Sequence, residues 1–135
     1  MADTFQCSVV TPEKAVLDTQ AEFVAFPAHD GEIGILPGRS PLLCRVGIGP
    51  LRVRTESGEQ TLFIDGGFAQ MVDNRLTILT EQAKEPSELD REAAKTALAE
   101  AEGSTAGDEK SFRDRQAALQ RARVQLRMTE PKGIV

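Results

Sequence analysis

Residues 26–43 read FPAHDGEIGILPGRSPLL, and this stretch decides how the first half of the chain folds. Glycine or proline interrupts it at short intervals, so its apolar runs stay short. The segment that ends at Pro27, the segment Ile33–Leu36 and the segment that begins at Leu42 all have the length of strands. No Gly-Lys-Ser/Thr follows the glycines and no helix starts after them, which excludes a phosphate-binding loop. The stretch therefore predicts short strands joined by tight turns.

Strand-like segments continue on both sides of this stretch, over about the first 82 residues. Turn residues separate them, and no segment has a helical period long enough to connect two parallel strands. Many short strands at close spacing are typical of a sandwich or a barrel, and we expect a β-sandwich. The segments are Phe5–Val10, Glu22–Phe26, Ile33–Leu36, Leu42–Val46, Leu51–Thr55, Leu62–Ile64, Phe68–Val72 and Leu76–Leu79.

The composition changes near Ala83, where glycine disappears for about twenty residues and good helix formers dominate. Ser87–Asp90 fits a capping box and predicts the start of a first helix. The segment 103–108 ends this helix, and a second helix is expected over Glu109–Met128. Because the connection is short, we expect an antiparallel hairpin. The predicted apolar positions are Leu89, Ala93, Ala94, Ala97, Leu98 and Ala101 in the first helix, and Phe112, Leu119, Ala122 and Leu126 in the second.

The 135 residues thus divide into a β-sandwich domain over 1–84 and a C-terminal antiparallel α-helical hairpin over 85–135, an α+β arrangement. Aromatic residues make up 4% of the chain and the net charge is −5, which argues against nucleic acid as a partner. No uncharged apolar run approaches the roughly 20 residues of a membrane-spanning helix, and the N-terminus lacks the features of a signal peptide. We therefore expect a cytosolic protein.

Side chains that carry catalysis or bind metals are scarce in the sequence. His29 is the only histidine, so no cluster has the spacing of zinc ligands, and we expect it to lie with Asp30 in a surface turn rather than in a catalytic pair. Cys7 and Cys44 stand in strand-like segments and are expected to be small buried hydrophobes rather than a disulfide. We expect no enzyme activity, no metal and no cofactor.

A resemblance to a known family begins in the opening stretch. The Gly-acidic-hydrophobic-Gly-Ile pattern of Gly31–Ile35 is followed by Pro-Gly, by Arg39 where the family often has His, and by Pro-Leu. The segments Val9–Lys14, Asp65–Leu79 and Leu89–Met128 resemble the first strand and turn, the last hairpin and the helical tail of the same family. Together these four segments make the chain resemble the epsilon subunit of bacterial F-type ATP synthases.

This resemblance implies a non-catalytic rotor subunit, in which the β-sandwich joins the gamma subunit to the c-ring and the helical tail restrains ATP hydrolysis. It also implies a peripheral position on the cytoplasmic face of the bacterial plasma membrane, with membrane contact only through the complex. Glu32 and Arg39 are the charged residues beside the Gly/Pro-rich loop. In the family this region lies at the end of the sandwich that meets the c subunits, so we expect both residues to face the c-ring.

The helical tail carries opposite charges on its two halves. Residues 84–109 have three basic and eight acidic side chains, and residues 110–135 have seven basic and two acidic ones, for net charges of −5 and +5. The apolar seam is mainly alanine and exposed ion pairs contribute only about 0–1 kcal/mol each, so a partner can move the hairpin. In the family the tail folds down on the sandwich in one state and extends up the central stalk in the other, where its basic second helix can meet the catalytic alpha and beta subunits, at an acidic segment of beta. The alternative is a merely solvated basic face. The resemblance assigns the contact here to Arg113, Arg115, Arg121, Arg123 and Arg127.

Some members of the family bind ATP on the tail through a Leu/Ile-Asp-x-x-Arg-Ala motif. Leu89–Ala94 reads LDREAA, in which Asp90 fits but Ala93 replaces the motif arginine; on the second helix Arg121 fits, and Gln125 stands where arginine can occur. Because arginine supplies charge-assisted bonds to phosphates, these replacements weaken the hypothesis of a nucleotide site at Asp90 and Arg121. Helix capping alone also explains Asp90. A nucleotide-sensing module that acts apart from the synthase is the rival function.

Overall fold

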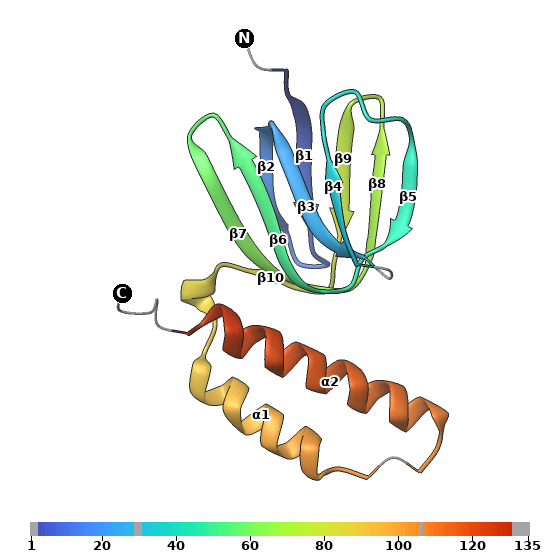
Figure 1. The fold of residues 1–135 in the computed structure, drawn as a ribbon, viewed down its shortest axis with the longest axis vertical. Coiled ribbons are helices and arrows are strands. Elements are labelled where there is room, and N and C mark those ends of the chain that lie inside the picture. The colour runs from blue at the N-terminus through green and yellow to red at the C-terminus, as the bar shows by residue number, and fades with distance from the viewer. Residues whose placement is uncertain (1–2, 29–30, 106, 131–135) are drawn as a thin grey trace.

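The computed structural model describes residues 3–28, 31–105 and 107–130, and places them in two stacked β-sheets with a helical hairpin at one end (Figure 1). The first sheet has the order β2-β1-β9-β8-β5 and the second sheet the order β10-β7-β6-β3-β4. Neighbouring strands are antiparallel except for β1 and β9, which are parallel. The predicted β-sandwich is therefore confirmed. Its strands are β1 (Phe5–Val10), β2 (Ala15–Ala21), β3 (Phe23–Ala28), β4 (Gly31–Ile35), β5 (Leu42–Arg45), β6 (Ile48–Thr55), β7 (Gly58–Asp65), β8 (Phe68–Val72), β9 (Arg75–Leu79) and β10 (Ala83–Lys84).

The hydrophobic core lies between the two sheets, because side chains alternate between the two faces of each strand. In β1, Phe5, Cys7 and Val9 are fully buried, and the residues between them are partly exposed. Cys7 is thus the small buried hydrophobe that the sequence predicts. Cys44 is half-buried, and both cysteines are free thiols.

Two strands contain prolines that the sequence places at strand ends. Pro27 was expected to close a strand but lies within β3, and Pro50 was expected in a turn but lies within β6. β6 tolerates Pro50 because β3 pairs only with Arg52–Arg54, which leaves one side of β6 unpaired at the proline. β2 and β10 were not predicted, since β2 is rich in polar residues and β10 has only two residues.

The C-terminal part forms the predicted hairpin, with one correction at its start. The capping box expected at Ser87 is wrong, because this residue lies inside a short 3-10 helix. Instead, Asp90 begins the first α-helix by accepting the backbone N–H of Ala93 at 3.1 Å. Asp108 caps the second helix through Ser111 at 2.7 Å, and this hydrogen bonding lowers the pKa of the Asp108 carboxyl. The elements are η1 (Pro86–Glu88), α1 (Arg91–Gly103) and α2 (Glu109–Met128).

The two helices pack through part of the predicted apolar positions. Ala94 and Ala101 of α1 and Leu119 and Ala122 of α2 are buried, whereas Ala93 and Ala97 are exposed. Phe112 was expected in the seam but is 53% exposed. Arg115 of α2 donates to the backbone oxygen of Glu102, which lies at the end of α1. Phe112 lies about one turn before Arg115, so it extends past the end of α1 and has no helix to pack against.

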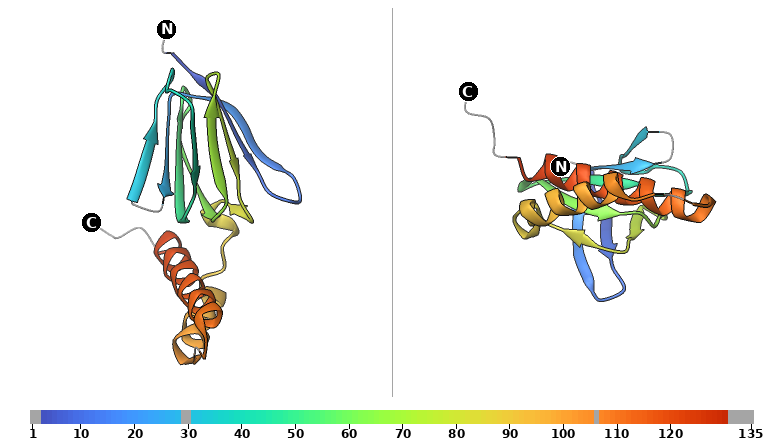
Figure 2. Two further views of the ribbon diagram at one scale, coloured as in Figure 1. Left: turned by 90° about the vertical axis from the view of Figure 1, so that its right-hand side faces the viewer. Right: turned by 90° about the horizontal axis from the view of Figure 1, so that it is seen from below.

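The hairpin lies across the end of the sandwich at which β6 begins and β7 ends, as the two further views show (Figure 2). α2 lies between the sandwich and α1, and it contacts β6 and β7 of the second sheet. α2 therefore has two packing faces, one toward α1 and one toward the second sheet.

Candidate interaction sites

The outer face of the first sheet carries four exposed large hydrophobic side chains. Leu43 of β5, Phe68 and Val72 of β8 and Leu79 of β9 are 71%, 49%, 37% and 51% exposed. Phe68 pairs with Leu79 across the two strands, and the Arg45 guanidinium lies 5.9 Å from the centre of the Phe68 ring. We call Leu43, Phe68, Val72 and Leu79 the apolar face. Single exposed hydrophobic residues are ordinary, but a group on neighbouring strands of one sheet is typical of an interaction surface.

A hollow of about 390 Å³ continues the apolar face at Leu79. Val10, Pro12, Gly67 and Thr80 also line it. Gly67 has a φ of +107°, and a Cβ atom there would lie 1.8 Å from the carbonyl oxygen of Leu79. Only glycine therefore allows the β7–β8 turn to approach the end of β9 so closely. The sequence shows this glycine as a turn residue but gives no sign of the hollow.

Glu32 and Arg39 lie in different elements and contact different residues. Glu32 is in β4, and its carboxylate forms a 2.9 Å ion pair with Arg52 of β6, with both side chains partly exposed. Arg39 lies in the β4–β5 loop, where its Nη1 donates to the backbone oxygen and the hydroxyl of Ser40 at 3.0 and 3.1 Å. Their orientation toward a c-ring stays a prediction. His29 and Asp30 lie outside the described residues.

Asn74 anchors the β4–β5 loop to the N-terminal strand. Its Oδ1 accepts the backbone N–H of Gly38 at 2.9 Å, and its Nδ2 donates to the backbone oxygen of Thr4 at 2.9 Å. Asn74 has a φ of 60°, a conformation that asparagine tolerates better than most residues. The sequence predicts Asn74 only as a turn residue, because both partners are distant along the chain.

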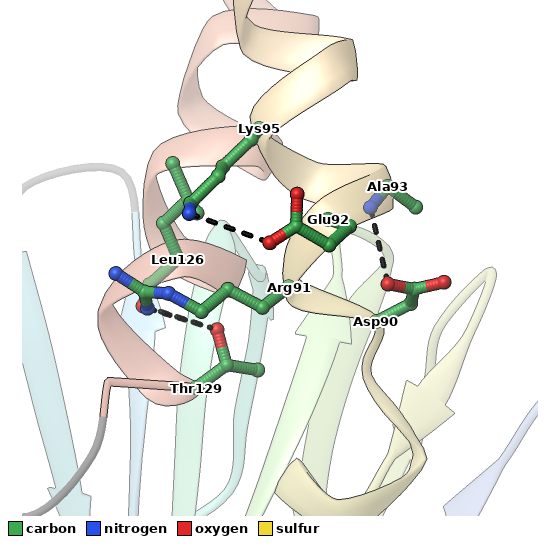
Figure 3. A network of polar contacts seen from close by, with 7 residues as sticks. All are labelled: Asp90, Arg91, Glu92, Ala93, Lys95, Leu126 and Thr129. Atoms are coloured by element: carbon green, nitrogen blue, oxygen red, sulfur yellow. Dashed lines mark hydrogen bonds and ion pairs between the residues drawn. The ribbon is translucent and has the colours of Figure 1, made fainter.

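The base of the hairpin is closed by a polar network around the motif that resembles the ATP-binding sequence (Figure 3). Nη1 of Arg91 donates to the backbone oxygen of Leu126 at 2.9 Å and to Oγ1 of Thr129 at 3.4 Å. The last carbonyls of a helix lack partners within the helix and carry partial negative charge, so an arginine stabilises them well. On the other side of α1, Asp90 caps the helix. In this structure the LDREAA segment thus caps one helix and ties it to the other.

The contact between α2 and the second sheet contains an ion pair. Nε of Arg121 donates to Oδ2 of Asp65 at 2.6 Å, and its Nη2 to Oδ1 at 3.3 Å. Next to it, Nε2 of Gln120 reaches the backbone oxygen of Ile48 at 3.5 Å. Val124 is 1% exposed and lies three residues after Arg121, on the same helix face. The sequence missed this interface, because it predicts only the stripe that faces α1.

Phe63 marks the sheet side of the same interface. Phe63 is fully buried, but it is not part of the core between the sheets. Its neighbours Leu62 and Ile64 do belong to that core. Alternation along β7 therefore places Phe63 on the outer face, where α2 and η1 contact this strand. Phe63 is thus a large aromatic side chain that points outward from the sandwich and is nevertheless fully buried.

The five arginines predicted to contact a catalytic subunit fall into two groups. Arg113, Arg123 and Arg127 are exposed. Arg115 is half-buried and donates to the backbone oxygen of Glu102 at 3.3 Å, and Arg121 is held by Asp65. The partner contact itself stays a prediction.

The two residues of the possible nucleotide site each have another structural role. Asp90 caps α1 and Arg121 pairs with Asp65. Ala93 is exposed and Gln125 is half-buried, and neither can supply the positive charge of the arginine it replaces. A nucleotide site here stays a prediction.

The thiols and carboxylates form no further site in the described part of the chain. Among residues 3–28, 31–105 and 107–130, no group of three potential ligands could hold a metal ion. No helix in the same ranges is long and apolar enough to cross a bilayer.

Burial raises the pKa of the Cys7 thiol to about 12, and the Asp18 carboxylate adds to this rise. Burial also raises the pKa of Cys44, against the opposing effect of Arg39.

The fold and these surfaces define a class of chain in which a β-sandwich domain carries a helical hairpin. Residues 4–86 match the family model of the ATP synthase delta/epsilon chain β-sandwich domain. The chain is 44% identical over 124 residues to the ATP synthase epsilon chain of Rhodopirellula baltica, covering 92% of this chain and 97% of the relative. It is 38% identical over 132 residues to that of Syntrophobacter fumaroxidans, covering 96% and 98%. The chain belongs to the ATP synthase epsilon chain family.

Solved structures share the same fold. A chain of the Euglena gracilis mitochondrial ATP synthase, seen by cryo-EM in an OSCP/F1/c-ring assembly, matches with a TM-score of 0.78 and 26% identity, covering 89% of this chain and 78% of that one. A chain of the Tetrahymena thermophila mitochondrial ATP synthase matches with a TM-score of 0.70 over 93% and 96% of the two chains, at 15% identity. The arrangement of sandwich and hairpin is thus shared with these chains.

Proposed function

We propose that this chain is a non-catalytic rotor subunit of a bacterial ATP synthase, which joins the gamma subunit to the c-ring. The apolar face and its hollow carry this proposal, because four exposed large hydrophobic side chains beside a concave site need a partner. The similar chain of Euglena gracilis comes from an assembly that contains F1 and a c-ring, which supports the same placement here. In that position the chain lies peripherally on the cytoplasmic face of the plasma membrane and touches the membrane only through the complex.

The gamma subunit is the partner that we assign to the apolar face. The face belongs to the first sheet, whereas the hairpin contacts the second sheet, so a subunit bound here leaves the hairpin uncovered. Leu79→Glu, at the edge of the hollow, is expected to weaken binding to purified gamma at least tenfold, because it places a charge in an apolar contact. Phe112→Ser is the matched control, since Phe112 is as exposed as Leu79 but lies on α2. Equal loss for both variants would contradict the assignment.

The c-ring is assigned to the region of Glu32 and Arg39. Arg39 stands in a loop between two strands and the Glu32 side chain is half exposed, so both offer charge to a partner. Arg39→Glu is expected to weaken assembly with the c-ring and to leave gamma binding unchanged. Co-purification of the variant with each partner separates the two contacts.

The helical tail is the element that we propose to restrain ATP hydrolysis, through arginines of α2 that contact the alpha and beta subunits. The candidates are Arg113, Arg115, Arg121, Arg123 and Arg127. Three of them, Arg113, Arg123 and Arg127, are exposed even with the hairpin packed as described, so an acidic partner can reach them without rearrangement. Such contacts lie partly in water, so their strength should fall with salt, the Debye length shrinking to about 3 Å at 1 M.

Removal of the tail from Ser87 onward tests the restraint. ATP hydrolysis by the reconstituted catalytic head is expected to rise on truncation, while assembly persists because the sandwich keeps its core. The triple reversal Arg113→Glu, Arg123→Glu and Arg127→Glu should have the same effect in the full-length chain and lose it in 1 M salt. Lys14→Glu, exposed in the β1–β2 turn, is the control for a change of charge alone. If truncation and triple reversal both leave hydrolysis unchanged at low salt, only the coupling role stands.

A further inference from the structure

Two exposed arginines stand at opposite corners of the apolar face. The strands β5, β8 and β9 lie side by side in the first sheet, and every second side chain of each strand points away from the core (Figure 1). Arg45 of β5 lies opposite Phe68, at the start of β8. Arg75 of β9 lies opposite Val72, at the end of β8. The apolar face therefore lies between the two arginines.

The two arginines are far enough apart to bracket a single contact. Their partners on β8, Phe68 and Val72, are four positions apart along the strand. Arg45 and Arg75 stand on the two strands that flank β8, one on each side. With about 3.4 Å per residue along a strand and about 4.8 Å between strands, their Cα atoms are roughly 17 Å apart. A partner that covers the apolar face therefore meets both guanidinium groups.

Neither guanidinium has a carboxylate partner in the part of the chain that the structure describes. The ion pairs found there belong to Arg52, Lys95 and Arg121, on other surfaces. Asp73 and Glu81 stand just outside β8 and β9 and pair with neither arginine. In a chain of net charge −5, this face is positive because its outward positions include no acid. These positions are Leu43, Arg45, Phe68, Gln70, Val72, Arg75, Thr77 and Leu79.

The neighbouring half of the same sheet surface is polar and bonds to itself. The Asp18 carboxylate of β2 accepts the hydroxyl of Ser8 at 3.1 Å and the side-chain amide of Gln6. Thr4 donates to the side-chain oxygen of Gln20 at 2.9 Å. The polar groups of β1 and β2 thus have partners within the sheet. The surface that lacks partners is the one over β5, β8 and β9.

Arg45 is held in an orientation that keeps its donors available. Its guanidinium lies 5.9 Å from the centre of the Phe68 ring. An arginine that stacks on an aromatic face uses the face of its planar group, whereas its N–H donors point outward in the plane of the group. Phe68 can therefore position the cation without occupying the hydrogen bonds that a carboxylate would accept.

We propose that Arg45 and Arg75 select an acidic surface on the gamma subunit. The segment of gamma that covers the apolar face presents apolar side chains at its centre and a carboxylate toward each arginine. Apolar contact has no fixed direction, so the two charge pairs at opposite corners set the orientation of gamma on the sheet. A neutral or basic surface would cover a guanidinium without a counter-charge, which costs free energy. This inference rests on the assignment of gamma to the apolar face.

Neutralisation of the two arginines tests the charge pairs. Arg45→Gln and Arg75→Gln in the full-length chain are each expected to weaken binding to purified gamma about threefold at low salt, and the double variant about tenfold, as partly exposed ion pairs do. These losses should nearly disappear in 1 M salt, where the Debye length is about 3 Å. Undiminished losses at high salt, or normal binding by the double variant at low salt, would overturn the proposal.

Arg54 is a matched control on the other sheet. It is exposed and lies 5.3 Å from the centre of the Phe23 ring, so Arg54→Gln removes the same kind of stacked cation away from the apolar face. Its binding to gamma and the salt dependence of that binding should equal those of the parent chain. An equal loss in Arg54→Gln would show an effect of overall charge and would contradict selection by Arg45 and Arg75.

Zero-length cross-linking tests for the carboxylates directly. Arg45→Lys and Arg75→Lys keep the positive charge and add an amine, which a carbodiimide joins to a contacting carboxylate as an amide while it takes up the water. Mass spectrometry of the digested complex should find the introduced lysines linked to Asp or Glu of gamma, and no such link for Arg54→Lys. Complexes that form normally but give no link at either position would contradict the proposal.

The Leu79→Glu variant separates this inference from the proposed function. Weak binding of Leu79→Glu with normal binding of the double arginine variant would refute the charge pairs alone and keep gamma on the apolar face. Normal binding of Leu79→Glu would refute the placement of gamma on this face, and the inference with it. Weak binding of both, with the arginine effect lost at high salt, is the expected result.

Discussion

Arg91, the first residue of α1, donates from Nη1 to the backbone oxygen of Leu126 in the last turn of α2, at 2.9 Å (Figure 3). The two residues are 35 positions apart, so the bond joins the outer ends of the hairpin. The opposite end is joined by the chain itself. The hairpin is therefore tied at both ends, although its apolar seam is mainly alanine.

Arg91→Gln is expected to loosen the hairpin, because a neutral amide cannot replace a cationic donor at the helix C-terminus. The loss should be about 1.5 kcal/mol in the free energy of hairpin unfolding, the lower end for a hydrogen bond to a charged group. Amide hydrogen exchange of the last turn of α2 measures it. Lys95→Gln is the control, since its 3.4 Å pair with Glu92 is exposed and its loss should change exchange little. Equal effects of both variants would contradict a special role for Arg91.

The two cysteines are predicted to react very differently in the folded protein. Cys7 is fully buried with a pKa of about 12, so almost no thiolate is present at pH 8, and a thiol reagent should modify it only on unfolding. Cys44 is half-buried and its raised pKa slows its reaction without blocking it. Mass spectrometry after labelling at pH 8 should find one modified cysteine, and two in denaturant. Fast labelling of Cys7 in the native chain would show that β1 opens readily.

The same pKa shift makes stability depend on pH in the alkaline range. The Cys7 thiol has a higher pKa in the folded chain, about 12, than its ordinary value of 9.0, so the unfolded chain loses the proton first. Its contribution is fully present below pH 9 and decreases between about pH 9 and 12, by up to about 1.4 kcal/mol per pH unit. Denaturant titrations of the parent and of Cys7→Ala should converge over this range. A parallel decline in both chains would contradict the assignment.

Much of the fold follows from the sequence because its signals are local. Turn residues, mostly Gly and Pro but Asp73 and Asn74 between β8 and β9, separate eight of the ten strands, and the change of composition near Ala83 predicts the helices. The exceptions have physical reasons. Pro50 stands within β6, where one side of the strand is unpaired, and the alternating pattern of β2 is masked by polar residues that face solvent.

The contacts that position the hairpin could not be predicted, because they join residues that are distant in sequence. Asp65 lies 56 positions from Arg121, and nothing in the local pattern of β7 distinguishes its carboxylate from a turn residue. Helical periodicity predicted the apolar stripe of α2 that packs on α1. The stripe that contains Val124 also contains glutamine and arginine, so its sequence is typical of a solvent-exposed helix face. Only the three-dimensional arrangement makes Phe63 an outward but covered residue.

Residues 1–84 are predicted to fold without the tail, since the core between the sheets contains no helical residue. Phe63 then loses its cover, so the truncated chain should unfold cooperatively but with lower stability. Phe63→Ala should cost about 3–5 kcal/mol in the full chain and much less in the truncated one. Phe26→Ala, in the core between the sheets, should destabilise both chains similarly. A truncated chain that binds hydrophobic dye and shows no sharp transition would establish that the tail completes the core.

The isolated chain is predicted to bind ATP weakly and to hydrolyse none. Ala93 and Gln125 stand at the motif positions of arginine, and Arg121 is held by Asp65. Ala93→Arg together with Gln125→Arg should strengthen binding, by at most about 1.5–3 kcal/mol for each charged hydrogen bond formed. Calorimetry measures both chains, with Ala97→Arg as the control for added charge on α1. Micromolar or tighter affinity in the unaltered chain would make nucleotide binding a function of this tail.

Asn74→Gly is predicted to free the β4–β5 loop while leaving the turn of Asn74 intact. Glycine adopts the φ of 60° without strain, so only the two side-chain hydrogen bonds, to Gly38 and to Thr4, are lost. Amide exchange at Gly38 should accelerate, and affinity for the c-ring should fall if the loop with Arg39 is its contact. Asp73→Gly, at the neighbouring position with a φ of 52°, is the matched control, because it makes the same backbone change without removing the anchor. Faster exchange at Gly38 with unchanged c-ring binding would support Asn74 as the anchor of the loop and contradict a contact between the loop and the c-ring. Unchanged exchange would show that the loop holds its position without Asn74.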